Sequence, residues 1–378
     1  MVKEISIPLS DLAVSDEMAD AVDETLRSGW WSMGPRVAEF ESAFAAFLGA
    51  RHAFAVTNGT AALHLALIAG GCGPGDEVVV PSLNFVAAAN TIAHVGATPV
   101  FCDVKGMDDL NLDPDDVAAA ITPATKAIVV LHYGGFACDM GAVLELAERH
   151  GVVVIEDAAH APGSRWDGRM CGTLGAIGCF SFFSNKNLPV GEGGMVVTDD
   201  DDIAERIRLL RSHGMTTLTW DRHRGHASTY DVVVQGFNYR LDELRAAMGL
   251  VQIRRLEDEN AARAKIAARY RDAFDGVNGL SMPFGDRLGD LASSHHLAVA
   301  IVSEGGARDG VRNRLGEQGI QTSLHYPPIH LFSAYRDGRG RKLPRTEAAA
   351  GRLLTLPLFA HMRDDQVTAV IDALAAAV

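Results

Sequence analysis

Short apolar segments alternate with alanine-rich helical segments from about residue 50 to residue 200. The apolar segments are rich in valine and isoleucine, and in chain order they read HAFAV, DEVVVPS, TPVFCDV, KAIVVLHYG, VVVIEDAAHA, GCFSFFS and GGMVVTD. Continuous apolar runs of this length are typical of strands that are buried on both faces by helices. The pattern therefore predicts an α/β domain with a mostly parallel sheet between helices.

The pattern changes after a long helical stretch predicted from about Leu241 to Phe274. A strand is predicted near HLAVAIV, a helix near RDGVRNRLGEQG, a second strand near IQTSLHY, and a final amphipathic helix in DDQVTAVIDAL. We interpret this part as a smaller α+β domain. We expect a large domain at residues 1–250, whose N-terminal segment could pack on the small domain, and a small C-terminal domain at residues 251–378.

Composition and charge exclude several classes of function for this chain of 378 residues. The formal charge is −14 and no long basic run is present, so nucleic acid is not an expected partner. No apolar run is long enough for a membrane helix, and the first residues do not resemble a signal peptide, so we expect a cytoplasmic protein. The five cysteines form no CxxC pair, which suggests neither a disulfide framework nor a metal site.

Lys186 lies between two apolar strands, in the segment CFSFFSNKNLPVGEGGMVVTD. Burial lowers the pKa of a lysine amine, and the neutral amine is a nucleophile toward carbonyl groups. The alternative is an ordinary solvated lysine in a surface loop. Position alone does not separate the two interpretations.

Glu156 and Asp157 end a very apolar strand, at the edge of the sheet where ligands collect in open α/β proteins. A carboxylate in that place needs a cationic or proton-donating partner. The protonated ring nitrogen of pyridoxal phosphate is such a partner, and its pairing with an aspartate makes the ring a stronger electron sink. The alternative is that Asp157 caps the next helix.

The segment TNGTAALHLAL begins a helix directly after a strand. The backbone amides of Gly59, Thr60 and Ala61 would point outward at the start of this helix, where a phosphate group fits. These residues could also be a simple helix cap. Phe85 follows the next strand, where its ring could stack on a planar ligand or pack in the core.

Five segments occur together in one order and spacing: TNGTAALHLAL, PSLNFVAAANTIAHVGATPVFCDV, VVIEDAAHAPGS, CFSFFSNKNLPVGEGG and GFNYRLDELRAAMGLVQIRRL. The chain thereby resembles the DegT/DnrJ/EryC1/StrS family, the sugar aminotransferases of pyridoxal-phosphate fold type I, over essentially its whole length. The resemblance implies a seven-stranded sheet in the large domain and pyridoxal 5′-phosphate as cofactor.

The resemblance also implies roles for residues of the cofactor site. Lys186 would hold the cofactor as a Schiff base and, once released, move the proton between the cofactor and the sugar carbon. Asp157 would pair with the ring nitrogen. Gly59, Thr60 and Ser181 fall where the family places contacts to the phosphate.

Further cofactor contacts are implied by the same comparison. Phe85 matches the aromatic residue that stacks on the ring, and Asn238 matches an asparagine that reaches the phosphate in the neighbouring subunit, which implies a homodimer with shared active sites. Asn238 could also be a turn residue. Many members carry glutamine where this chain has His160, and this histidine could donate to the phenolic oxygen of the cofactor or contact the aspartate. The dehydratase branch of the family replaces the lysine by histidine, so Lys186 disfavours dehydration.

Substrate contacts are expected from two further segments that resemble family regions. SGWWSMGP places Trp30 beside the sugar pocket, and GIQTSLHYPPIHLFSAYR places His325 and Tyr326 at its mouth. Arg240 could bind a diphosphate or the donor's carboxylate, or form a subunit salt bridge. The alternative for the aromatic residues is packing.

The function that the resemblance implies is amino transfer from glutamate or glutamine to a nucleotide-linked keto-sugar in amino-sugar biosynthesis. A dTDP-4-keto-6-deoxyhexose aminated at C4 is the first choice. A 3-keto-sugar or a cyclitol such as scyllo-inosose is the alternative substrate. A non-catalytic regulator that binds the cofactor is the alternative from another class, and the absence of GxGxxG disfavours a dehydrogenase.

Overall fold

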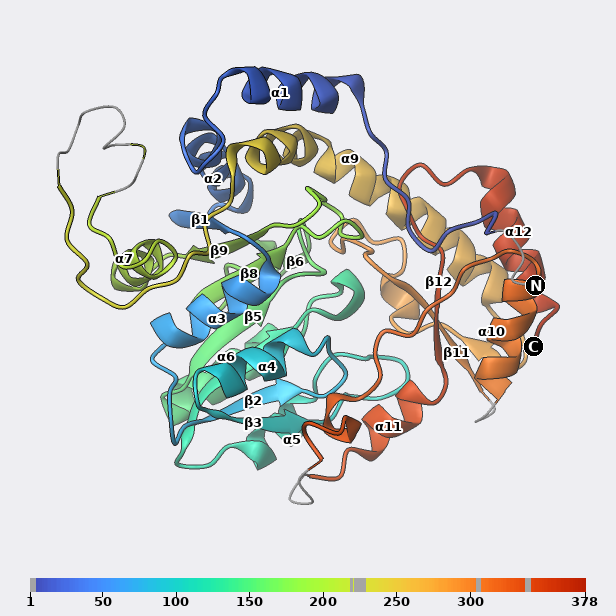
Figure 1. The fold of residues 1–378 in the computed structure, drawn as a ribbon. Helices are drawn as coiled ribbons and strands as arrows, with labels where there is room; N and C mark the ends of the chain where they lie inside the picture. The colour runs from blue at the N-terminus through green and yellow to red at the C-terminus, as the bar shows by residue number, and fades with distance from the viewer. Residues whose placement is uncertain (1–4, 218–219, 221–228, 304–306, 337–340) are drawn as a thin grey trace.

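A seven-stranded sheet forms the centre of the computed structural model (Figure 1). The structure describes residues 5–217, 220, 229–303, 307–336 and 341–378. In spatial order the strands are β1 (His52–Val56), β9 (Gly194–Thr198), β8 (Ile177–Ser181), β5 (Val153–Asp157), β4 (Thr125–Leu131), β2 (Glu77–Pro81) and β3 (Thr98–Cys102). All neighbours from β8 to β3 pair in parallel, whereas β9 is antiparallel to β8 and β1. The predicted mostly parallel seven-stranded sheet is confirmed.

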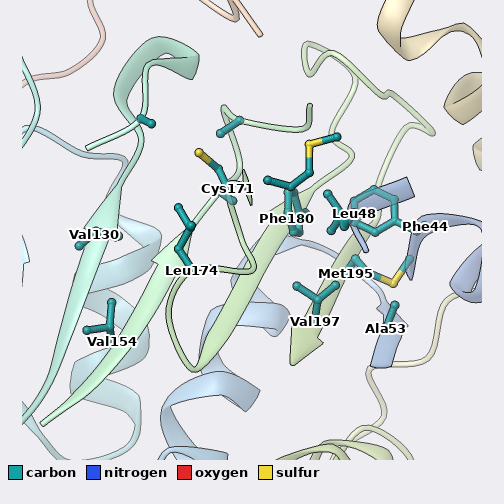
Figure 2. Close-up of a cluster of buried hydrophobic side chains, with 14 of the residues drawn as sticks. Phe44, Leu48, Ala53, Val130, Val154, Cys171, Leu174, Phe180, Met195 and Val197 are labelled. Carbon is teal, nitrogen blue, oxygen red and sulfur yellow. The ribbon is translucent and has the colours of Figure 1, made fainter. Parts of the chain in front are cut away.

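Two hydrophobic clusters cover the two faces of this sheet. On one face lie α3 (Gly59–Ala69), α4 (Ala87–His94) and α7 (Asp201–Leu210). On the other face lie α2 (Pro35–Leu48), α5 (Pro114–Ala120) and α6 (Met140–His150), and Figure 2 shows part of this second cluster. Side chains alternate between the faces along each strand, so Ile128 and Val130 of β4 belong to one cluster while Ala127 and Val129 belong to the other. This alternation explains why the strands are apolar throughout.

A smaller antiparallel sheet occupies the C-terminal part of the chain. It consists of β10 (Leu280–Ser281), β11 (Ala298–Val302) and β12 (Leu353–Leu356). Its core includes residues of α10 (Ala307–Glu317) and α12 (Asp364–Ala375), and Val367, Val370, Ala373 and Leu374 of α12 are buried. The core also contains Ile7, which pairs with Ile320, so the N-terminal segment lies against this part of the chain.

The remaining elements connect or flank the two sheets. They are α1 (Asp16–Arg27), the hairpin of β6 (Arg165–Trp166) and β7 (Arg169–Met170), α9 (Glu243–Phe274), α11 (Pro344–Ala350) and the 3₁₀ turns η1 (Tyr133–Gly135), η2 (Gly285–Arg287) and η3 (Ile329–Leu331). Helix α9 extends from the large sheet to the small one, with α1 beside its first half (Figure 1). The predicted boundary at residue 250 falls inside α9, and the division into domains stays a prediction.

The strand predicted near IQTSLHY is wrong. Ile320 and Ser323 each form only a single bridge, to Ile7 and Thr355 respectively. The chain then turns toward the large sheet and reaches Pro327 and Pro328, which have no amide hydrogen to continue a ladder. The third strand of the small sheet is β12, which the apolar pattern did not reveal. In the described residues, no helix combines the length and the apolar character needed to cross a membrane.

Phe44 of α2 offers a test of the core between this helix and the large sheet. Its ring is fully buried and lies 5.0 Å from the ring of Phe180 and 5.4 Å from that of Phe182. Phe44→Ala should lower the free energy of unfolding by about 3–5 kcal/mol, because it removes buried area and leaves a cavity. Urea titration of Phe44→Ala and of the control Phe47→Ala, which is only partly buried, measures the difference. Equal losses in the two variants would contradict this assignment of the core.

Candidate active site

A cavity of about 420 Å³ lies at the edge of the large sheet where the parallel strands end. Strand β5 ends at Asp157, β8 ends at Ser181, and α3 begins at the same edge. Ligands bind at this edge in open α/β sheets. Nine of the residues that the sequence singled out line the cavity: Gly59, Thr60, Phe85, Asp157, His160, Ser181, Lys186, His325 and Tyr326.

Lys186 lies in the connection between β8 and β9, and its side chain lines the cavity. The side chain as a whole is half-buried, and the amine is its buried end. Loss of hydration lowers the pKa of Lys186 to about 8, and the charge of Asp157 opposes this shift. The amine therefore loses its proton far more easily than that of an ordinary lysine.

Asp157 is the last residue of β5 and is 6% exposed. Burial raises the pKa of its carboxyl group, while the amide of Ala159, the charge of Lys186 and the side chain of Asn84 act in the opposite direction. The Ala159 amide donates to Oδ1 over 3.3 Å, and Asn84 Nδ2 donates to Oδ2 over 3.5 Å. Both bonds are long, so the carboxylate keeps the capacity to accept a stronger donor from the cavity.

The first turn of α3 lies at the wall of the cavity. The side chain of Asn58 caps the helix by accepting from the Ala61 amide over 2.8 Å. Within the described chain, the amides of Gly59 and Thr60 donate to no protein acceptor. A Cβ atom on Gly59 would lie 2.8 Å from Cβ of Ser181, so only glycine lets the helix approach β8 this closely. Two free amides, a helix N-terminus and the Ser181 hydroxyl are a donor set that fits a phosphate group.

Phe85 does not pack in the core. Its side chain is 57% exposed, although it directly follows Asn84, which is buried. Its ring lies 6.1 Å from that of Tyr326, on the opposite wall of the cavity at a tilt of 54°. An exposed aromatic ring at the mouth of a cavity is available to stack on a planar ligand.

His160 and Tyr326 form a hydrogen-bonded pair whose direction is fixed. The Gly134 amide donates to Nδ1 of His160, so the proton of a neutral ring lies on Nε2, which donates to the Tyr326 hydroxyl over 2.8 Å. Burial, Lys186 and His296 together keep the pKa of His160 well below its usual value, so the ring is neutral. The Tyr326 hydroxyl accepts from His160 and retains its own proton for a ligand in the cavity.

Three predicted residues lie outside the cavity. Trp30 packs edge-on against Trp220 at 4.8 Å. Arg240 donates to the Ser212 hydroxyl over 3.1 Å, and burial and the neighbouring Arg211 lower its pKa. Asn238 is exposed in the segment that runs beside the end of β1. Within one chain the structure therefore does not bring these three to the other site residues.

Some residues at the cavity escaped the sequence analysis. Asn84, Asn185 and Glu192 line it, and His296 approaches Lys186 from outside it. Asn84 could have been found from its position beside Phe85 at a strand end. His296 lies 110 residues from Lys186, and no local pattern marks it.

The family model of the DegT/DnrJ/EryC1/StrS aminotransferase family matches residues 13–375. The chain belongs to this family. It is 45% identical over 375 residues to the spore coat polysaccharide biosynthesis protein SpsC of Bacillus subtilis (strain 168), a match that covers 97% of this chain and 96% of SpsC. The protein is thus a sugar aminotransferase that depends on pyridoxal phosphate.

Solved structures agree with this assignment. The aminotransferase TlmJ from Streptoalloteichus hindustanus is 40% identical, with a TM-score of 0.91 and 98% of each chain covered. The putative sugar aminotransferase Spr1654 from Streptococcus pneumoniae, solved in a PLP-form, is 28% identical with the same TM-score and 98% of each chain covered. The groups that line the cavity fit this cofactor. The amine of Lys186 suits its carbonyl group, the carboxylate of Asp157 suits its ring nitrogen, and the free amides of α3 suit its phosphate.

Asp157→Ala tests the expected contact to the ring nitrogen. A charge-assisted hydrogen bond contributes about 1.5–3 kcal/mol, so cofactor affinity should fall about 10- to 100-fold, and the turnover rate should fall as well. Titration of the apoprotein with pyridoxal phosphate, followed by absorbance, measures the affinity. Asp202→Ala, at an exposed position of α7, is the control. Unchanged affinity and rate in Asp157→Ala would mean that another group serves the ring.

Proposed function

We propose that this enzyme transfers an amino group from glutamate or glutamine to a nucleotide-diphosphate-linked keto-sugar, at C4 of a dTDP-4-keto-6-deoxyhexose. The observation that carries the amino transfer is the amine of Lys186 beside the buried Asp157, on the wall of a cavity that also has an anion site. The sugar part rests on membership of the family. A further relative, DesI, 34% identical with a TM-score of 0.88, is described in the presence of its TDP-sugar product.

The residues of this chain divide the work of binding and proton transfer. Bound pyridoxal phosphate supplies an electrophilic carbonyl and a conjugated ring that accepts an electron pair. The amides of Gly59 and Thr60 and the Ser181 hydroxyl would hold its phosphate, and Asp157 would accept from the ring nitrogen and keep it protonated.

Lys186 moves the proton in this scheme. With a pKa of about 8, about a tenth of its amine is neutral at pH 7, against less than about a thousandth at the ordinary lysine pKa. A group with its pKa near the working pH can both take a proton from carbon and return it. The Tyr326 hydroxyl, oriented by His160, donates to an oxygen of the bound ligand.

A panel of keto-sugar nucleotides tests the proposed substrate. The enzyme, loaded with pyridoxal phosphate and supplied with glutamate or glutamine, should convert a dTDP-4-keto-6-deoxyhexose to the 4-amino sugar, as measured by mass spectrometry and NMR. Lys186→Ala is the control and should give no turnover. Amination of a 3-keto-sugar or of scyllo-inosose instead would overturn the choice of substrate. If the visible absorption band of the bound cofactor stays the same whichever amino donor is added, the protein is a regulator and not an enzyme.

We also propose a homodimer in which each site borrows a residue from the second copy. Apolar side chains are exposed near the cavity and in the segment before Asn238: Phe85 is 57% exposed, Phe183 45%, and Val232 and Val233 51% and 57%. A partner chain would remove these side chains from water. The exposed Asn238, outside the cavity of its own chain, would then be free to reach the phosphate site of the other.

Mixed subunits test this assembly. An isologous interface gives two equivalent sites per dimer. If Asn238 serves the opposite site, a heterodimer of an Asn238→Ala subunit and a Lys186→Ala subunit has one doubly altered site and one intact site. Mixing two poorly active parents should then restore up to half of the activity per heterodimer. Formation of heterodimers without any gain in activity would show that Asn238 serves its own subunit or only shapes the turn.

A cytoplasmic location is the third part of the proposal. All five cysteines are free and buried. Burial raises the pKa of the Cys102 and Cys179 thiols well above the usual value, which makes them unreactive. Free thiols of this kind suit a reducing compartment. Cell fractionation with an antibody against the chain would test the location.

A further inference from the structure

His296 approaches Lys186 from the side of the small sheet. It lies two residues before β11, is 8% exposed, and places Nε2 3.4 Å from the amine of Lys186. This distance is at the outer limit of a hydrogen bond. The contact joins a residue of the C-terminal part of the chain to the reactive amine of the large sheet.

The hydrogen bonds behind His296 fix which ring nitrogen carries the proton. Asn187 Nδ2 donates to the Ser294 carbonyl and to Oδ1 of Asn260, both over 2.8 Å. A carbonyl oxygen can only accept, so the amide of Asn187 has a single possible orientation, with Oδ1 3.0 Å from Nδ1 of His296. Nδ1 must therefore be the donor. The lone pair of Nε2 then faces the amine of Lys186.

The orientation of the Asn260 side-chain amide is also determined by its hydrogen bonds. Nδ2 of Asn260, on α9, donates to the Pro162 carbonyl over 2.9 Å, so Oδ1 is the atom that faces Asn187. Both asparagines and His296 are buried. Within the described chain, a series of hydrogen bonds thus runs from the Pro162 carbonyl through Asn260, Asn187 and His296 to Lys186.

Two cavities meet at Lys186. The larger one is the cofactor cavity, and a second one of about 30 Å³ lies on the other side of the lysine. Lys186 lines both, whereas His296 lines the smaller and not the larger. The smaller cavity has space for about one water molecule, so it admits movement of the amine but not a substrate.

We propose that His296 is a positioning residue that accepts a hydrogen bond from the amine of Lys186 whenever this amine is not joined to the cofactor. It thereby keeps the amine at the cavity wall, within reach of the proton that it must move. The inference rests on the proposed function of Lys186 in proton transfer, and it identifies His296 as the group that orients the amine.

The charges around Lys186 determine the direction of the expected effect. Asp157 is the carboxylate whose charge acts on the amine, and the neighbouring imidazoles are those of His160, His296 and His325. Glu259 and Arg263 of α9 line the small cavity with Lys186 and His296, and the charge of Arg263 helps to keep the His296 ring neutral. Burial is the main cause that lowers the pKa of each of these histidines, so all three are neutral near pH 7. A neutral acceptor binds an ammonium more strongly than an amine. Loss of Nε2 should therefore lower the pKa of Lys186 further.

The test compares His296→Met with His296→Gln in the full-length apoprotein. The two side chains are similar in length and flexibility, but only glutamine carries an amide that can accept from Lys186. The measurement is the rate of acetylation of Lys186 by acetic anhydride as a function of pH, followed by peptide mapping. The midpoint should fall by about one pH unit in the methionine variant, while the glutamine variant should lie nearer to the wild type.

His361→Gln is the matched control, because His361 lines the same small cavity but bonds to Asp11. It should leave the midpoint unchanged. The inference is overturned if His296→Met has the midpoint of the wild type. If that variant does not fold, ¹⁵N NMR of histidine-labelled wild-type apoprotein decides: an unprotonated Nε2 on His296 is expected, and a protonated one contradicts the inference. None of these results depends on which keto-sugar is accepted, so they are separable from the test of function.

Discussion

Exclusion of water from the amine of Lys186 and the carboxyl group of Asp157 is the constraint on which the arrangement of the site depends. Burial moves the two pKa values toward each other, down to about 8 for the lysine and upward for the aspartate. Burial thus disfavours the charged form of each group, and the charge of each group partly offsets this effect in the other. A cofactor with a carbonyl group and a protonated ring nitrogen would react with the amine and pair with the carboxylate. It would thereby reduce the free-energy cost of burying both groups.

The neighbouring residue Glu156 shows how hydrogen bonds from the protein offset the cost of burying a carboxylate. Glu156 precedes Asp157 in β5 and points to the other face of the sheet, because side chains alternate along a strand. It accepts from Nε2 of His132 over 2.9 Å and from the amides of Gly172, Leu174 and Gly175 over 2.6–2.7 Å. The hydrogen-bonding capacity of Glu156 is therefore met by protein groups, and these bonds hold the loop before β8 in place. Asp157, with two long bonds, is left available.

The sequence predicted the features that depend on local pattern. The parallel sheet follows from the spacing of apolar runs, and Lys186 and Asp157 could be placed because strand ends of a parallel sheet meet at one edge. His296 could not be predicted, since its contact depends on how the small sheet packs against the large one. Trp30, expected from the resemblance, and Arg240, expected from the chemistry of its guanidinium group, lie away from the cavity of their own chain. No strand forms at IQTSLHY, because Ile320 and Ser323 pair with different segments, at Ile7 and at Thr355, and not with one continuous strand.

Helix α9 has a consequence for how the molecule unfolds. It has 32 residues and is therefore about 48 Å long. Its first half packs in the core of the large sheet through Ala246 and Leu256, and its second half packs in the core of the small sheet through Ile266 and Tyr270. Melting of either core would expose one face of this helix and remove support from the other half. Loss of structure in one sheet should therefore destabilise the other.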